Sequence, residues 1–246
     1  MDRMLYVAMS GAKETLLAQA ANSNNLANAN TTGFLADLQQ FRSMPVFGDG
    51  YPTRVYGLSE RPAIDFHSGS IVQTGRELDV ALNGKGWITV QAPDGSEAYT
   101  RRGDLKLDVN GLLTTGNGLP VIGNSGPIAI PPAEKIDIAP DGTISIRPLG
   151  QEITELAIVD QIKMVNPPVT DLEKGLDGLM RLKSGASAEP DASLQLVGGT
   201  LESSNVNVVD SMVDMIELAR RFDIQVKMMK AADEMEQGST SIMRFG

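Results

Sequence analysis

The chain has 246 residues, of which 41% are hydrophobic and 4% aromatic, enough to bury one ordinary core or two small ones. Its net charge of −10 would repel a phosphate backbone, and the absence of cysteine excludes disulfides, thiolate metal sites and a thiol nucleophile. No stretch approaches the roughly 20 apolar residues of a spanning helix, and the first residues lack a signal-peptide pattern. We therefore expect no nucleic-acid partner, no membrane insertion and no cleaved signal.

The first predicted element is an amphipathic helix from about Leu5 to Leu26. Its flanks are alanine, serine and glutamine, so it lacks the wide apolar face that would anchor it on a core of its own. We expect it to pack against another helix. Its narrow stripe advances in alternating steps of four and three residues: Leu5, Met9, Ala12, Leu16, Gln19, Ser23 and Leu26.

Five asparagines lie among the thirteen residues that end at Phe34. Asparagine is a poor interior helix residue but tolerates turns, so Asn28, Asn30 and Gly33 predict a helix end. Asn25 falls within the helical pattern, where a polar group could fix the register of neighbouring helices. The alternative is that these asparagines are ordinary helix-end residues.

The middle of the chain predicts an all-β body. Residues 36–77 carry three prolines and few periodic runs, which indicates an extended connector, and residues 184–204 indicate a shorter return connector. Between them the hydrophobic period is two, and Asn-Gly and Pro-Asp-Gly sequences mark turns. The expected strands are Leu78–Leu82, Trp87–Val90, Leu105–Val109, Ile136–Ile138 and Thr143–Ile146, with weaker signals at Leu156–Val159, Ile162–Val165 and Leu179–Leu182.

A second, stronger helix is predicted from about Asn207 onward. Asn207 is the expected N-cap, with Asp210 completing a variant of the capping box, and Glu217 with Arg221 forms a pair at helical spacing. Its stripe again alternates four and three: Val208, Met212, Met215, Ala219, Phe222, Val226 and Met229.

The expected fold class is therefore α+β, with a mainly β central body. The terminal helices pair into a coiled-coil-like domain that is discontinuous in sequence. Its expected parts are residues 1–35 and 205–246, with connectors at 36–77 and 184–204 and a β body at 78–183.

Signals for catalysis or ligand binding are weak. His67 has no second histidine or cysteine to complete a metal site. Gly84-Lys85-Gly86 lacks the glycine spacing and the hydroxyl residue of a phosphate-binding loop, and therefore predicts a tight turn. Carboxylates near turns could form a lysozyme-like pair, Asp94 with Glu97 or Asp104 with Asp108, but acids at turns usually serve solubility and local hydrogen bonds. We expect no catalytic site, cofactor, metal or small-molecule substrate.

Four blocks of sequence resemble the flagellar rod and hook family, the axial proteins of the bacterial flagellum. They are Asn25-Leu26-Ala27-Asn28 followed by Thr32-Gly33-Phe34, "LDVALNGKGW" from Leu78, "YTRRGDLKLDVNGLLTTGNGLPVIG" from Tyr99, and "LESSNVNVVDSMVDMI" from Leu201. "ARRFDIQVKMMKAADE" from Ala219 is similar to the proximal-rod group of that family. "GFLAD" after Thr32 departs from the lysine that many relatives place after the phenylalanine.

This resemblance implies a structural, self-assembling axial subunit that transmits torque across the periplasm. It implies export by the flagellar type III apparatus and assembly with itself and other rod subunits in the basal body. Alternatives are a distal-rod or hook-type subunit, a periplasmic peptidoglycan hydrolase, or an adhesin or phage-tail fibre. The expected assembly contacts are Leu5, Met9, Leu16, Asn25, Leu26, Asn28, Val208, Met212, Met215, Ile216, Phe222, Val226 and Met229.

Overall fold

The computed structural model describes residues 4–45, 55–59, 63–148 and 157–244. The chain divides into two compact units. The helical unit comprises Met1–Ala29, Ala36–Asp65 and Val206–Gly246, and the β unit comprises Asn30–Leu35 and Phe66–Asn205. Two helices and many short strands confirm the α+β fold class.

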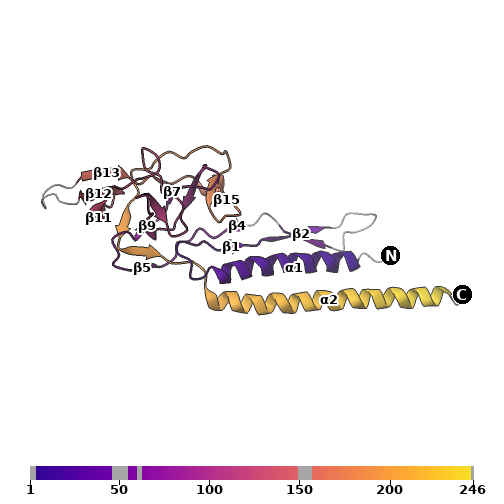
Figure 1. The fold of residues 1–246 in the computed structure, drawn as a ribbon. Helices are drawn as coiled ribbons and strands as arrows, with labels where there is room; N and C mark the ends of the chain where they lie inside the picture. The colour runs from indigo at the N-terminus through magenta and orange to yellow at the C-terminus, as the bar shows by residue number, and fades with distance from the viewer. Residues whose placement is uncertain (1–3, 46–54, 60–62, 149–156, 245–246) are drawn as a thin grey trace. The chain divides into compact units, whose positions relative to one another are not determined.

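Two helices, α1 (Met4–Ala27) and α2 (Val208–Arg244), dominate the helical unit (Figure 1). Asn22 Nδ2 donates to the carbonyl oxygen of Ser211 at 2.6 Å, near the start of α2. Further back in α1, a Cβ built on Gly11 would lie 3.0 Å from the side-chain amide of Gln225. As residue numbers fall along α1 they rise along α2, so the helices are antiparallel, and the pairing expected from the sequence is confirmed.

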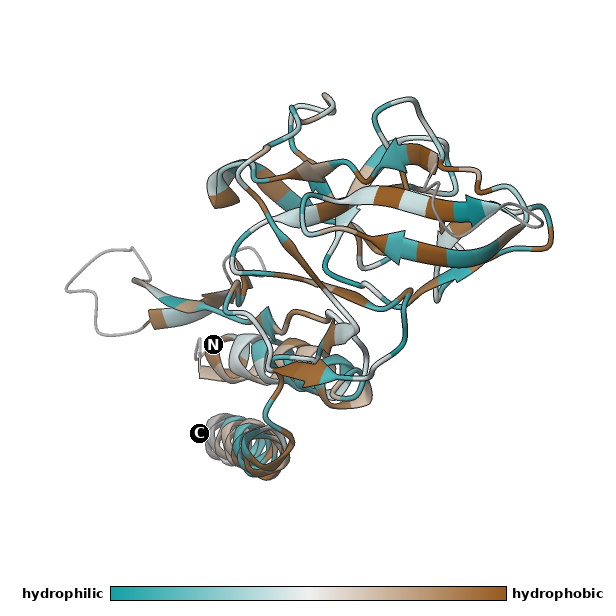
Figure 2. Cartoon of the chain, turned by 90° about the vertical axis from the view of Figure 1, so that its left-hand side faces the viewer, coloured by the Kyte–Doolittle hydropathy of each residue, from teal (hydrophilic) through white to brown (hydrophobic). Residues whose placement is uncertain are grey.

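Small side chains form the α1 side of this contact. The buried residues of α1 are mostly alanine, with one threonine and one asparagine, and small residues let two helix axes approach closely. On α2, Ser211 is buried and Gln225 is half-buried, and residues on their face recur in steps of four and three. That face consists of Ser211, Met215, Leu218, Phe222, Gln225 and Met229. Figure 2 shows the two helices side by side in cross-section.

Short strands complete the helical unit. β1 (Asp37–Leu38) pairs with β4 (Ala63–Ile64), and β2 (Phe41–Pro45) pairs with β3 (Val55–Ser59), both antiparallel. The β2–β3 pair packs on α1, where Gly57 lies against the Glu14 side chain: a Cβ on that glycine would be 3.8 Å from Glu14 Cγ. One side of α1 therefore meets α2 and another meets β3.

The β unit is built from small antiparallel sheets. Its central sheet has the strand order β14-β7-β8-β16-β15, a second sheet has the order β11-β12-β13, and three two-stranded pairs surround them. A 3-10 turn spans Val169–Asp171. The strands are β5 Ile71–Gln73, β6 Val80–Leu82, β7 Trp87–Gln91, β8 Glu97–Thr100, β9 Leu105–Leu107, β10 Leu113–Thr115, β11 Ala133–Ile138, β12 Thr143–Pro148, β13 Ala157–Gln161, β14 Met164–Val165, β15 Leu172–Lys174, β16 Met180–Leu182, β17 Leu196–Gly198 and β18 Thr200–Glu202.

One apolar cluster holds these sheets together. Ile88, Val90, Leu105, Leu113 and Ile144 have no measurable exposure. Ile88 and Val90 lie two positions apart on β7, and the other three come from β9, β10 and β12. Burying such aliphatic side chains supplies about 1.5–3 kcal/mol each, which is the main stabilising term of a body with so little helix. The alternation of brown and teal along the strands in Figure 2 follows this inward and outward pattern.

Both expected connectors belong to the compact units. Residues 36–65 lie in the helical unit, whereas residues 66–77 and 184–204 lie in the β unit. Within the return segment Leu194 and Leu196 are buried in the core, and β18 pairs with β5. The structure therefore differs from the expected boundaries at 36–77, 78–183 and 184–204. Strands of two or three residues are too short for an alternating pattern to reveal them.

Candidate assembly surface

The first turns of α2 present an apolar face to solvent. Asn207 caps this helix as expected: its side-chain oxygen accepts from the backbone N–H groups of Val209 and Asp210. Met212 and Ile216 are 51% and 55% exposed although both are large and apolar. With Val209 and Val213, also exposed, they share the helix face that points away from Ser211 and Gln225.

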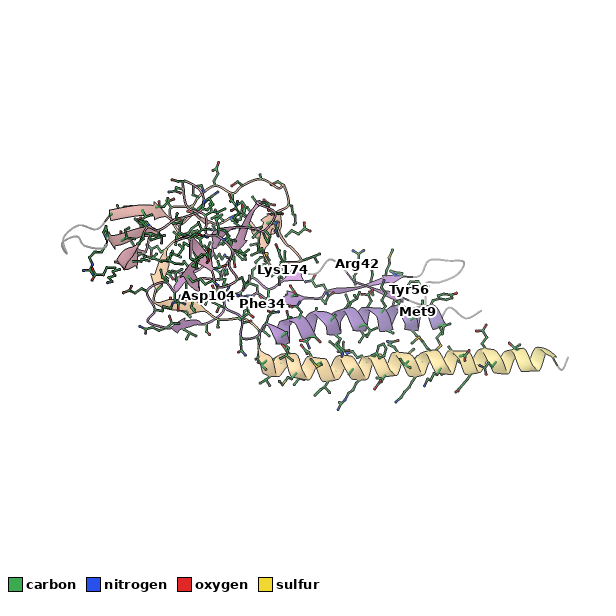
Figure 3. All side chains as sticks on the ribbon, viewed as in Figure 1. Met9, Phe34, Arg42, Tyr56, Asp104 and Lys174 are labelled. Atoms are coloured by element: carbon green, nitrogen blue, oxygen red, sulfur yellow. The ribbon has the colours of Figure 1, made fainter. Side chains whose placement is uncertain are left out.

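The outer side of α1 carries a matching stripe. Leu5, Met9 and Leu16 are all exposed, whereas Ala8 next to Met9 and Thr15 next to Leu16 are buried (Figure 3). The stripe of large residues therefore does not form the contact with α2 inside the chain. Small residues fill that contact, and the large residues remain available to a further partner.

The thirteen expected contact residues fall into three groups by exposure. Exposed residues are Leu5, Met9, Leu16, Val208, Met212 and Ile216. Half-buried residues are Leu26, Asn28, Met215, Phe222, Val226 and Met229, and of these Met215, Phe222 and Met229 share the α1-facing side of α2. Asn25 alone is buried.

Asn25 is fully engaged inside the helical unit. Its side-chain nitrogen donates to the carbonyl oxygen of Asp37, and its side-chain oxygen accepts from the N–H of Asp37, both at 2.8 Å. The Asn25 side-chain amide thus forms with Asp37, the first residue of β1, the two hydrogen bonds that the backbone of a neighbouring strand would form. Asn28 instead bonds to Asn24, one turn back in the same helix. These contacts give Asn25 a role in the fold of its own unit, and its expected role between subunits stays a prediction.

The β2–β3 pair adds an apolar surface that the sequence pattern did not predict. Met44 pairs with Tyr56 and Arg42 with Leu58, so these four side chains share one face (Figure 3). Gly57, on the opposite face, lies against α1. Met44 and Leu58 are both 44% exposed. Residues 41–45 show no regular alternation and end at Pro45, so the pattern of this segment gave no signal for a strand.

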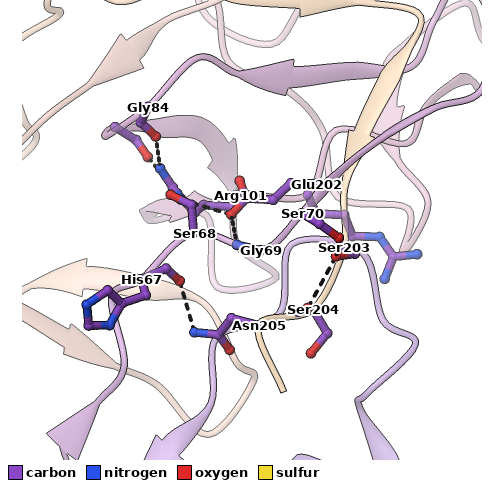
Figure 4. Close-up of polar contacts among 12 residues, drawn as sticks. His67, Ser68, Gly69, Ser70, Gly84, Arg101, Glu202, Ser203, Ser204 and Asn205 are labelled. Carbon is purple, nitrogen blue, oxygen red and sulfur yellow. Dashed lines mark hydrogen bonds and ion pairs between the residues drawn. The ribbon is translucent and has the colours of Figure 1, made fainter. Parts of the chain in front are cut away.

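A buried ion pair lies at the centre of the β unit's polar contacts (Figure 4). Arg101 and Glu202 have side chains only 4% and 2% exposed, and Arg101 Nη1 lies 2.9 Å from Glu202 Oε1. The remaining donors of Arg101 reach Ser68 Oγ and the carbonyl oxygens of Gly84 and Gly86. We call these five residues the Arg101 cluster. Its guanidinium also lies 5.7 Å from the centroid of the Trp87 ring.

The Arg101 cluster ties together the segments of the β unit that adjoin its boundaries with the helical unit. Gly33 N donates to the Glu202 carbonyl oxygen at 2.8 Å, and Gly69 N donates to Glu202 Oε1 at 2.9 Å. Asn205 donates from its side chain to the His67 carbonyl oxygen at 2.9 Å. The three stretches around residues 33, 67–70 and 202–205 are thus fixed to one another within the β unit.

Three family models match parts of the chain. The family described as "Flagella basal body rod protein" matches residues 5–34, and "Flagellar hook protein FlgE/F/G D1 domain" matches residues 81–146. "Flagellar basal body rod FlgEFG protein C-terminal" matches residues 197–242. The first and last matches cover α1 and most of α2.

Relatives match the chain almost from end to end. The flagellar basal-body rod protein FlgF of Escherichia coli (strain K12) is 43% identical over 240 residues, which cover 95% of each chain. The FlgF of Salmonella typhimurium is 41% identical over 249 residues and 99% of each chain. The rod protein FlgG of Bacillus subtilis is 33% identical over 267 residues, covering 99% of this chain and 100% of its own.

The chain belongs to the family of flagellar basal-body rod proteins. In this rod protein the Thr32-Gly33-Phe34 block, which follows α1, has a packing role within the β unit. Gly33 has φ +64, and a Cβ there would come 2.5 Å from the carbonyl carbon of Arg101. The Phe34 ring lies 4.5 Å from Lys174 Nζ. A glycine at this position is therefore required by both backbone conformation and space.

The carboxylates of this rod protein that were considered for catalysis have structural partners. Asp94 accepts from the hydroxyl and N–H of Ser96, and Asp104 forms a two-bonded ion pair with Arg102 at 2.6 and 2.7 Å. Glu97 accepts from Lys163 at 2.9 Å. Each arrangement holds a turn or joins neighbouring strands.

Glu97 belongs to a polar group that fixes the loop after β16. Burial raises the pKa of Glu97, but hydrogen bonds from Ser187, Lys163 and Tyr99 outweigh burial and hold that pKa below its usual 4.5. Burial raises the pKa of Tyr99 to about 12, and its hydroxyl accepts from the N–H of Ala188 at 2.8 Å. Strand β8 thereby holds the loop around Ser187 and Ala188.

In the described part of the rod protein, no group of three or more histidine, aspartate or glutamate side chains could hold a metal ion. Neither of its helices is long and apolar enough to span a bilayer.

Proposed function

We propose that this rod protein is a structural, self-assembling axial subunit of the proximal rod, and that it transmits torque. The observation that carries the proposal is the division of side chains on the helix pair. Small residues of α1 face α2, whereas Leu5, Met9 and Leu16 on α1 and Met212 and Ile216 on α2 face outward. A subunit that associates through its helices requires this division.

The energetics favour association through these faces. An apolar side chain taken from solvent to a packed interface contributes about 1.5–3 kcal/mol, so a few such residues on each helix can offset the entropy lost when subunits associate. The α1 side of the α1–α2 contact buries mainly alanine, which supplies less than a large apolar side chain would. Neighbouring subunits would therefore add to the stability of the helix pair.

The proposed location is the periplasmic rod of the basal body, with other rod subunits as partners. Support comes from the names of the relatives, all of which are basal-body rod proteins, and from greater identity to the two FlgF relatives than to the FlgG relative described above. We further propose export by the flagellar type III apparatus without signal cleavage, which the resemblance of the sequence blocks implies. Distal-rod and hook-type roles are the less favoured alternatives.

A peptidoglycan hydrolase remains the alternative from another class. An open groove lies between Asn166 and Ala192 and is lined partly by acids. Its Asp191 has a pKa lowered by the Ser193 hydroxyl and N–H, the opposite of the raised pKa that a general acid needs. We therefore propose a protein without a catalytic site. Release of muropeptides from purified peptidoglycan, abolished by one carboxylate replacement, would establish the alternative.

The proposed function is tested by placing a charge on the outer face of α2. Ile216→Lys should leave the thermal unfolding of the purified protein nearly unchanged, because Ile216 is already exposed. In bacteria lacking their own copy, the variant should be produced and exported but should fail to support motility and full-length rods.

The matched control is Ile158→Lys on β13, where the isoleucine is 73% exposed. This variant should assemble and swim like the parent protein. Normal rods with Ile216→Lys would contradict the proposed assembly face, and equal defects in both variants would show a general intolerance of added charge.

A further inference from the structure

The β unit contains three Asn-Gly sequences, at Asn83, Asn110 and Asn117, and all three asparagines are exposed. Asn-Gly is the sequence in which an asparagine most readily loses its amide. The backbone nitrogen of the glycine attacks the side-chain carbonyl carbon, the C–N bond to the amide breaks, and ammonia leaves. Water then opens the five-membered imide to aspartate or isoaspartate. The structure distinguishes the three sites by how freely each glycine nitrogen can attack.

Two of the glycine nitrogens are held in turns. Gly111 N donates to the Asp108 carbonyl oxygen at 2.9 Å, and Gly118 N donates to the Thr115 carbonyl oxygen at 2.8 Å. A hydrogen-bonded N–H must break that bond before the nitrogen can turn toward the asparagine side chain. Gly111 is also crowded, because a Cβ there would lie 2.7 Å from the Ile130 carbonyl oxygen.

The third glycine is both open and unbonded. Among the described residues Gly84 N donates to no partner, and a Cβ built on Gly84 would meet nothing within 4 Å. Asn83, Gly84 and Lys85 are all exposed. The ring that the reaction must form therefore has space, and its nucleophile has no competing bond.

We propose that Asn83 is the preferred site of spontaneous deamidation in the folded protein, ahead of Asn117 and then Asn110. Water is the only co-reactant, one molecule of ammonia is released, and no electrons are transferred. The product carries one additional negative charge at residue 83. The proposal does not depend on the role of the protein in a rod.

Deamidation at this site has a structural consequence because the next residue belongs to the Arg101 cluster. The Gly84 carbonyl oxygen accepts from Arg101 Nη2, and the Gly86 carbonyl oxygen accepts from Arg101 Nε. An isoaspartyl link adds one atom to the main chain immediately before Gly84. The carbonyl that Arg101 uses must then shift, so the modification weakens one acceptor of the buried guanidinium.

The test is a time course on the full-length protein at mildly alkaline pH and physiological temperature. Peptides are prepared by digestion at acidic pH, and the NH2-to-OH exchange at each asparagine is followed by mass spectrometry. The same incubation in concentrated urea provides the reference, since there the three sites differ only in local sequence. Asn83→Gln, which closes such a ring far more slowly, and Asn110→Gln serve as a matched pair.

In the folded protein Asn83 should deamidate several-fold faster than the other two sites, and this preference should shrink in urea. Asn83→Gln should remove most isoaspartate, measured by enzymatic methyl transfer, whereas Asn110→Gln should remove little. Equal or faster reaction at Asn110 or Asn117 in the folded chain, or no reaction at Asn83, would overturn the proposal. The wild-type time course decides the matter even if a variant does not fold.

Discussion

Arg101 and Glu202 lie 101 positions apart in the sequence, yet their side chains meet at 2.9 Å in an almost fully buried ion pair. The pair lies where the segments around Gly33 and Gly69 join the strand that ends at Glu202. Removing one member of such a pair leaves a buried charge without its partner, which is far more costly than removing both.

Arg101→Met should destabilise the β unit by about 3–5 kcal/mol, as measured by chemical denaturation at neutral pH. The matched control is Arg221→Met, which removes an exposed pair with Glu217 and should cost less than about 1 kcal/mol. Similar losses in the two variants would show that the buried pair is not a principal support of the unit.

The defect of Arg101→Met should also depend on pH. Burial raises the pKa of Glu202 above 4.5, while Arg101 lowers it. A carboxyl whose pKa is raised in the folded state favours folding most below its unfolded pKa, and this contribution is lost as pH rises through the folded pKa. Without Arg101 the folded pKa rises further, so the deficit should be smaller at acidic than at neutral pH. A deficit that is constant across this range would contradict the assignment.

Glu97 should show the opposite dependence. Its pKa lies below 4.5, so its contribution to stability is present above pH 4.5 and is lost as pH falls through the folded pKa. Glu97→Gln should therefore be less stable than the parent at neutral pH, and the difference should narrow in acid. Thermal melts at a series of pH values test this, together with proteolysis of the loop around Ser187, which should become faster in the variant.

Replacing Asn25 by alanine should destabilise the helical unit. The change removes the two 2.8 Å bonds to the N–H and carbonyl groups of the half-buried Asp37, and each such hydrogen bond contributes about 0.5–1.5 kcal/mol net. Ser23→Ala, at an exposed position of the same helix, should change stability by no more than about 0.5 kcal/mol. Hydrogen exchange at Asp37 is the direct readout, and unchanged protection in Asn25→Ala would refute the role.

Fragments of the chain should show where the β unit ends. A fragment of residues 66–205 should unfold cooperatively, whereas one of residues 78–183 should be much less stable. The shorter fragment lacks Leu194 and Leu196, which are buried in the core, and losing large apolar core side chains costs about 2–5 kcal/mol each. Equal melting temperatures would show that the return segment is dispensable.

The sequence predicted most of the architecture because its strongest signals are local. The N-cap at Asn207, the Glu217–Arg221 pair and the strand around Trp87 all depend on residues a few positions apart, and the structure contains each of them. Strands such as β5 and β18 escaped prediction because their pairing joins residues far apart in sequence. A strand of two or three residues is too short to show a sequence pattern that would reveal its pairing with a distant segment.

The candidate surface was predicted only in part for a related reason. A stripe with steps of four and three shows that a helix has one apolar side, but not whether that side faces its own chain or another. On α1 the adjacent stripe of small residues forms the contact with α2, and Leu5, Met9 and Leu16 are exposed to solvent. Asn25 could not be assigned from sequence because its partner, Asp37, lies in a segment without a clear pattern.

The unequal length of the two helices gives the helical unit a direction. α2 has 37 residues and α1 has 24. Because Gly11 lies opposite Gln225 and the helices are antiparallel, Met4 lies opposite about residue 232. About a dozen residues of α2 therefore extend beyond the first described residue of α1. A projecting end and a shorter end are not alike, so two copies joined end to end meet through different surfaces. Contacts of that head-to-tail kind do not close on themselves unless a rotation returns to its start, and otherwise they propagate as an open, polar helix. In the proposed assembly, the asymmetry of a single helix pair would therefore give the polymer two different ends.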